Sequence, residues 1–184
     1  HTRTDGFFDI TVHSENYTPS TISGIQLSSE AHTLFFQHSG ININLSGFLK
    51  GYALESIREL LQLYGIEDAL VNMGNSSILA LGHHPLATGW RIGFEQGFVS
   101  NKGEKQEVLL KNECLTVSGN DSLERKHIIA PYSGKLIEGK WMVAVVTESG
   151  AVGEILSTAW FAADTYQQKL LEMEFHPRLI LKLC

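Results

Sequence analysis

Short β-prone runs lie between two helical patterns, and this order constrains the fold more than any other feature of the chain. Strand-type runs occupy residues 68–74, 76–82, 89–95, 126–131 and 140–148, and residues 107–119 predict two more. A helix is predicted from Gly51 to Gly65, because apolar residues recur at helical spacing: Ala53, Ile57, Leu60, Leu61 and Tyr64. A second helix is predicted from near Gly153 to Glu172, with a closing strand over 175–184.

Clustered strands flanked by helices favour an α+β fold, a largely antiparallel sheet with helices packed against it. A length of 184 residues predicts a single domain over 1–184. Before the first helix, Asp5-Gly6 is a turn signal followed by a β-prone run, and residues 13–23 read as a polar loop. Residues 32–45 predict a strand pair that turns at Ser39-Gly40.

The composition excludes some classes of function. A net charge of -6 argues against a nucleic-acid-binding face, and no apolar run approaches the roughly 18 residues of a membrane helix. No H-x-x-x-H or C-x-x-C spacing indicates zinc. The two cysteines, Cys114 and Cys184, neither require nor exclude a disulfide, so they do not indicate a cellular compartment. No export signal is recognised in the sequence, which begins at His1.

The segment GAVGEILSTAWFAA places a carboxylate, Glu154, and a hydroxyl, Thr158, one helical turn apart. Residues at i and i+4 share a helix face, so these two oxygen donors could hold a hard cation or a polar substrate group. The alternative is an exposed polar pair near a helix N-terminus, where an acid is favoured by the helix dipole.

The segment NINLSGFLKGYALES joins a strand to a helix through Ser46-Gly47 and Lys50-Gly51. A helix N-terminus with a nearby lysine suits an anion such as phosphate, although a tight turn with a solvated lysine explains the same residues. VNMGNSS and TVSGND place Asn72, Ser118 and Asn120 where they could contact a ligand or cap a turn. His127, at a strand start, is either a general base or an ordinary structural histidine.

Several blocks taken together carry a resemblance to one family. Six blocks occur in the order found in the ApbE family, from Asp5 to about Phe161: D-G-F-F-D-I-T-V, L-S-G-F-L-K-G-Y-A, V-N-M-G-N, T-V-S-G-N, H-I-I-A-P-Y-S-G and G-E-I-L-S-T-A. The resemblance implies the ApbE-like, T-fold-related α+β sandwich. It also implies the activity of an FAD:protein FMN transferase, which uses Mg²⁺ to move FMN from FAD to a Thr or Ser hydroxyl of a target protein.

The resemblance also implies roles for individual residues. The metal ligands fall on Glu154, Thr158 and the carbonyl of Gly47, and the catalytic histidine falls on His127. The implied FAD-binding positions are Lys50, Gly51, Glu55, Asn72, Gly74, Ser118 and Gly119.

The chain departs from the family pattern mainly by losing acids. Glu154 replaces an Asp, and Asn44, Ser76 and Ala130 stand where the family has carboxylates. Because divalent-ion affinity depends on ligand charge, three alternatives stay open: a flavin-binding descendant with impaired catalysis, an FAD pyrophosphatase, and a scaffold that binds no flavin.

The resemblance implies two further expectations. Family members carry a substantial region before the D-G-x-F-D block, whereas here four residues precede Asp5. The chain would then match the C-terminal portion of the family domain, with an FAD pocket open on one side and an apolar surface that favours a partner chain or homo-oligomer. The family works in the periplasm or anchored to the outer side of the cytoplasmic membrane, often as a lipoprotein.

Overall fold

A five-stranded antiparallel sheet forms the centre of the molecule. The computed structural model describes residues 1–94, 106–120, 122 and 127–183. The strand order is β11-β10-β7-β4-β3, and every neighbouring pair is antiparallel. The strands are β3 (Ala69–Met73), β4 (Ser77–Leu81), β7 (Glu113–Gly119), β10 (Met142–Thr147) and β11 (Leu179–Leu183). The predicted α+β class with a largely antiparallel sheet is confirmed.

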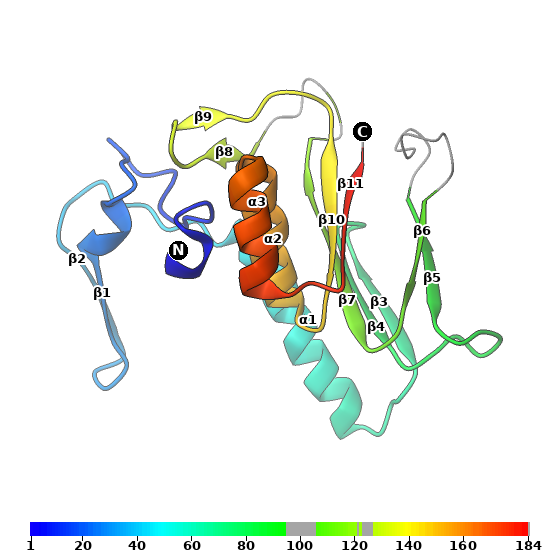
Figure 1. Cartoon of the computed structure of the whole chain (residues 1–184). Helices are drawn as coiled ribbons and strands as arrows, with labels where there is room; N and C mark the ends of the chain where they lie inside the picture. The colour runs from blue at the N-terminus through cyan, green and yellow to red at the C-terminus, as the bar shows by residue number, and fades with distance from the viewer. Residues whose placement is uncertain (95–105, 121, 123–126, 184) are drawn as a thin grey trace.

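Helices cover one face of this sheet and a hairpin covers the other (Figure 1). The helices are α1 (Ser46–Leu63), α2 (Gly150–Ala162) and α3 (Thr165–Phe175). The hairpin consists of β5 (Trp90–Gly93) and β6 (Glu107–Leu110). No described helix is long and apolar enough to cross a membrane.

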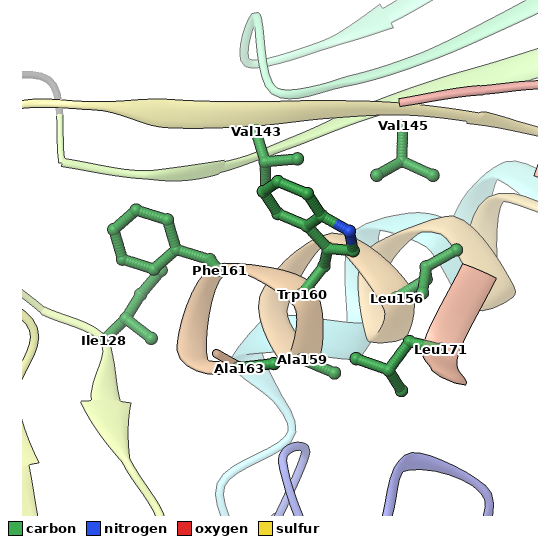
Figure 2. Close-up of a cluster of buried hydrophobic side chains, with 9 residues drawn as sticks. All are labelled: Ile128, Val143, Val145, Leu156, Ala159, Trp160, Phe161, Ala163 and Leu171. Atoms are coloured by element: carbon green, nitrogen blue, oxygen red, sulfur yellow. The ribbon is translucent and has the colours of Figure 1, made fainter. Parts of the chain in front are cut away.

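Burial on both faces explains the unbroken apolar run of β10. Val143 and Val145 pack against Leu156 and its neighbours on α2 (Figure 2). Ala144 and Val146 point the other way, into a cluster that includes Val108 and Leu110 of β6. Alternate side chains of a strand face opposite sides of the sheet, so a strand between two layers must be apolar throughout.

The helix boundaries differ from the prediction. The first helix begins at Ser46 rather than Gly51. Its N-cap is Leu45, and the Asn44 side chain just before it accepts a hydrogen bond from the Ser46 amide. The predicted second helix is two helices. Asp164 accepts hydrogen bonds from the amides of Tyr166 and Gln167, so its side chain caps α3 and separates it from α2.

The strands predicted in the N-terminal region, after Gly6 and over residues 32–45, were wrong in position. The strand pair consists of β1 (Ile25–Ser28) and β2 (Thr33–Phe36), which turn well before Ser39-Gly40, and residues 41–45 form no strand. The run after Gly6 forms turns, because the Asp9 carboxylate accepts hydrogen bonds from the amide and hydroxyl of Thr11. The 3-10 segments η1 (Thr2–Thr4) and η2 (Thr21–Gly24) complete this region.

The other predicted strands form, with shifted ends. The run at 126–131 yields only β8 (Ile129–Ala130), which pairs with β9 (Lys135–Leu136). The outer ends of the runs at 89–95 and 126–131, and Cys184, lie outside the described residues.

Candidate active site

A cavity of about 1010 Å³ lies where α1, α2 and the strand ends meet the N-terminal segment and the β5–β6 hairpin. It receives side chains from elements far apart in the sequence. Of the predicted site residues, those that line the cavity are Gly47, Lys50, Asn72, Gly74, Ser118, Gly119, His127, Glu154 and Thr158. The structure therefore brings together residues that the sequence predicted from five separate blocks.

A close crossing of α1 and α2 brings the two helical blocks together. Gly51 and Gly150 meet at this crossing, where a β-carbon added to Gly51 would lie 2.2 Å from the Gly150 carbonyl oxygen. Gly47 lies one turn before Gly51, and a β-carbon added there would be 3.8 Å from the hydroxyl of Thr158. The crossing thus sets the start of α1 beside the polar face of α2.

Glu154 is the buried acid that α2 contributes to the cavity. The residue is 3% exposed, and its Oε1 accepts a hydrogen bond from the hydroxyl of Ser77 on β4. Burial raises the pKa of Glu154, and this rise is opposed by the Ser77 hydrogen bond and by the positive charge of Lys50. The cavity wall therefore holds a carboxylate whose burial disfavours its charge, with one hydroxyl donor and one lysine charge that partly offset this effect.

Thr158 belongs to a chain of hydroxyl groups. The Ser118 hydroxyl lies 3.1 Å from Thr158 Oγ1 and 2.7 Å from Ser157 Oγ. Ser118 comes from β7, so this contact joins the sheet to α2 at the edge of the cavity. The hydroxyls can exchange donor and acceptor roles to suit a ligand.

Lys50 supplies the positive charge at the start of α1. Its ammonium group donates a hydrogen bond to the Ser76 hydroxyl, at the turn between β3 and β4. In the same turn, Asn72 and Asn75 are joined by two hydrogen bonds of 2.9 and 3.0 Å. Gly74 has a φ of +67°, which explains why this tight turn carries a glycine.

His127 and Gly119 lie on other parts of the wall. His127 is exposed and lines the cavity just before β8. Gly119 ends β7 with a φ of +146°, and a β-carbon there would lie 2.5 Å from the backbone of Trp141 and Met142. The close approach of two strands therefore explains Gly119, and its place on the cavity wall follows from that packing.

Two predicted cofactor-binding positions lie away from the cavity lining. Gly51 faces Gly150 at the helix crossing, and Glu55 accepts a 3.4 Å hydrogen bond from the Ala151 amide at the start of α2. Asn120, also considered as a ligand contact, is fully buried and donates to the carbonyls of Ile137 and Gly139. These residues support the site from behind through packing and backbone hydrogen bonds.

Sequence reasoning did not identify the N-terminal wall of the cavity or its apolar side. The wall consists of Phe7, Phe8, Asp9, Val12 and His13, and the apolar side includes Ile78, Ile92, Phe94, Leu115, Val117 and Met142. The buried Asp9 fixes the wall, since its second oxygen accepts a 3.0 Å hydrogen bond from Tyr17. The D-G-F-F-D block was the available signal for this wall, whereas nothing in the alternation of β5 indicates that it faces a ligand.

The oxygen donors that α1 and α2 contribute to the cavity suit a magnesium ion that is shared with a phosphate ligand. Mg²⁺ prefers hard oxygen ligands and usually takes one or two carboxylates together with waters and substrate phosphates. Glu154, Thr158 and the backbone at Gly47 offer such a set. No group of three or more His, Cys, Asp and Glu side chains that could hold a metal occurs in the described part of the chain.

The fold and the cavity together define an α+β protein with a large cavity beside two crossing helices and the end of an antiparallel sheet. The chain belongs to the ApbE family, whose model matches residues 1–178.

Curated relatives carry one common name. An FAD:protein FMN transferase of Klebsiella pneumoniae (strain 342) is 25% identical over 137 residues, which are 70% of this chain and 41% of that protein. An FAD:protein FMN transferase of Rhodobacter capsulatus is 26% identical over 174 residues, 90% of this chain and 31% of that protein. The chain therefore spans less than half the length of these relatives.

Solved structures share the fold. The flavin transferase ApbE from Vibrio cholerae superposes with a TM-score of 0.79 at 20% identity, covering 98% of this chain and 66% of that one. The ApbE protein from Thermotoga maritima gives a TM-score of 0.78 at 22% identity, covering 98% of this chain and 68% of that one. The likeness confirms the ApbE-like fold.

Proposed function

We propose that this protein is an FAD:protein FMN transferase, which moves FMN from FAD to a Thr or Ser hydroxyl of a target protein with Mg²⁺. One observation carries the proposal. The start of α1 and the polar face of α2 place Gly47, Lys50, Glu154 and Thr158 along one cavity, which His127 also lines. Membership of the ApbE family and the shared name of the curated relatives support it.

The cavity suits a dinucleotide in size and lining. Its volume of about 1010 Å³ lies at the upper end of the roughly 300–1,000 Å³ found for small-molecule sites. Its apolar side offers a surface for a flat ring, and its polar wall offers hydroxyls and a lysine. FAD contains both kinds of group, an aromatic ring system and a charged pyrophosphate.

Three groups would hold the magnesium ion: the Glu154 carboxylate, the Thr158 hydroxyl and the carbonyl of Gly47. When bound, the ion neutralises negative charge on the pyrophosphate during transfer. Lys50 contributes a second positive charge at the same wall, and it is oriented by its hydrogen bond to Ser76.

The transfer exchanges one P–O bond for another. The acceptor hydroxyl oxygen attacks the phosphorus of the FMN half, and its proton passes to the His127 imidazole. The bond from that phosphorus to the bridging oxygen breaks, and AMP leaves with the bonding electron pair. Water in place of the acceptor would yield FMN and AMP, which is the FAD pyrophosphatase alternative.

Product analysis tests the proposal. The protein is incubated with FAD and MgCl₂, alone and with a candidate acceptor protein, and FMN, AMP and covalently bound flavin are measured. We expect product that depends on Mg²⁺ and is lost in Glu154→Ala. The matched control is Glu59→Ala, an exposed acid on α1. Absence of FMN, AMP and flavinylated acceptor would count against the proposal.

A second candidate is a flavin-binding protein that does not turn FAD over. The observation that favours it is the loss of acids: Asn44, Ser76 and Ala130 stand where the family has carboxylates, and Asn44 and Ser76 line the cavity. Thermal melting with FAD, with and without EDTA, separates the candidates. A ligand at 100 times its dissociation constant stabilises by about 2.7 kcal/mol. A shift insensitive to EDTA, with no product, supports the second candidate, and no shift supports a scaffold.

The location and the assembly of the protein are further proposals. By family resemblance we place it outside the cytoplasm, which fractionation of the native cells tests.

The β1–β2 hairpin exposes apolar side chains, with Leu27 78% and Phe35 59% exposed. Exposed apolar surface favours a partner chain or a second copy, and light scattering of the purified protein tests the second.

A further inference from the structure

Ser77 lies directly behind the acid of the site. It is the first residue of β4 and is fully buried, and its hydroxyl donates to Oε1 of Glu154 across 77 residues of sequence. Glu154 lines the cavity, whereas Ser77 is absent from its lining. Ser77 therefore contacts the acid from outside the cavity.

The backbone of Ser77 is held on both sides by the sheet. It pairs with Met73 on β3 and with Thr116 on β7. A hydroxyl on such a residue has little freedom to move, so the hydrogen bond fixes the carboxylate rather than following it. This matters for a glutamate, because its side chain has three rotatable bonds and a buried position leaves it few other donors.

The hydrogen bond divides the two carboxylate oxygens between two tasks. Oε1 is engaged by Ser77, which does not line the cavity, and we expect Oε2 to be the oxygen that meets a ligand. Carboxylates that bind metals are commonly oriented by such outer hydrogen bonds, and loss of one typically weakens metal affinity by about 10–100-fold.

We propose that Ser77 is a positioning residue that holds the Glu154 carboxylate toward the cavity and thereby sets the affinity of the site for a divalent cation. The part that concerns the cation rests on the proposed function. The part that concerns the orientation of Glu154 does not.

The test compares Ser77→Ala with a matched control, Thr116→Val. Thr116 is the cross-strand neighbour of Ser77, is equally buried, and has a hydroxyl without a hydrogen-bond partner in the described structure. Calorimetric titration with Mg²⁺ in the presence of ADP, an unreactive diphosphate, measures cation affinity. We expect Ser77→Ala to weaken Mg²⁺ binding by about 10–100-fold and Thr116→Val to leave it unchanged.

A double-mutant cycle separates positioning from general damage. In a Glu154→Asp background, which keeps a carboxylate but shortens its reach to Ser77, Ser77→Ala should cause a smaller loss of Mg²⁺ affinity than in the wild type, because Ser77 acts only through the acid. An equal loss in both backgrounds would overturn the proposal.

Crystal structures of the metal-free wild type and Ser77→Ala provide a second readout. We expect the Glu154 side chain to leave its position in the variant, and an unmoved carboxylate with unchanged Mg²⁺ affinity would overturn the proposal. If the wild type binds no Mg²⁺, the proposed function fails, while the position of Glu154 in the two structures still decides the role of Ser77.

Discussion

Gly51 on α1 lies so close to the backbone of Gly150 on α2 that no β-carbon fits at Gly51, and one at Gly150 would make a tight contact. A β-carbon on Gly51 would lie 2.2 Å from the Gly150 carbonyl oxygen, and one on Gly150 would lie 3.0 Å from the Gly51 carbonyl oxygen. Both neighbours are backbone atoms and cannot rotate away. The distance between the two helices, and with it the geometry of the candidate site, depends on these two glycines.

Gly51→Ala should therefore destabilise the protein and separate the site residues. Alanine normally favours a helix by about 1 kcal/mol over glycine, but overpacking costs about 1–3 kcal/mol or more. Because the contact at Gly51 is with backbone atoms, we place the cost at the upper end of this range and expect a net loss of about 2 kcal/mol or more in the free energy of unfolding, measured by denaturant titration. Ser56→Ala, at an exposed position of the same helix, is the control and should change stability little. Equal stability of Gly51→Ala and wild type would contradict this account of the crossing.

Glu154→Gln should stabilise the metal-free protein at neutral pH. Burial raises the pKa of Glu154 in the folded state, so its contribution is most favourable at low pH and is lost as the pH rises through the folded pKa. Glutamine removes the charge and can still accept from Ser77. Melting temperatures measured between pH 4 and pH 8 should diverge: the melting temperature of the variant should increase relative to that of the wild type as the pH rises. Parallel curves would show that the acid carries no such cost.

Lys50→Met should weaken FAD binding if the lysine contacts the pyrophosphate. A hydrogen bond to a charged group is worth about 1.5–3 kcal/mol, which corresponds to about 10–100-fold in affinity. Fluorescence titration with FAD measures the change. Lys169→Met, at an exposed site on α3, is the matched control. A Lys50 variant that binds FAD as tightly as the control would place the pyrophosphate elsewhere.

Cys114 should resist alkylation in the folded protein. Burial raises its pKa to about 11, although the Arg58 guanidinium, which donates to the sulfur at 3.3 Å, opposes the rise. At pH 8 roughly one molecule in a thousand would then carry the reactive thiolate. Iodoacetamide labelling followed by mass spectrometry should modify the Cys114 peptide in denaturant and spare it without denaturant. Rapid labelling of the folded chain would indicate that β7 opens readily.

The types and order of most elements could be read from the sequence. The alternation of Ile41, Ile43 and Leu45 misled, since residues 41–45 form no strand. Short apolar runs predict β3 and β4, and 3.6-residue spacing predicts the body of α1, because each pattern depends only on the geometry of neighbouring residues. The same local rule places Glu154 and Thr158 on one face of α2. The helix boundaries were harder to predict, because each depends on a single side chain. Asn44 and Asp164 accept hydrogen bonds from amides at the starts of α1 and α3, while the apolar pattern alone does not mark these positions.

The pairings that make the site lie beyond such local rules. Ser77 meets Glu154, and Lys50 meets Ser76, only because the sheet and two helices bring together residues that are 77 and 26 positions apart. By itself the sequence determined the type of most segments after residue 46 and which side chains share a helix face, because backbone geometry repeats over two to four residues. Only the tertiary structure decided which faces meet, because that depends on how closely whole elements can pack, as at Gly51 and Gly150.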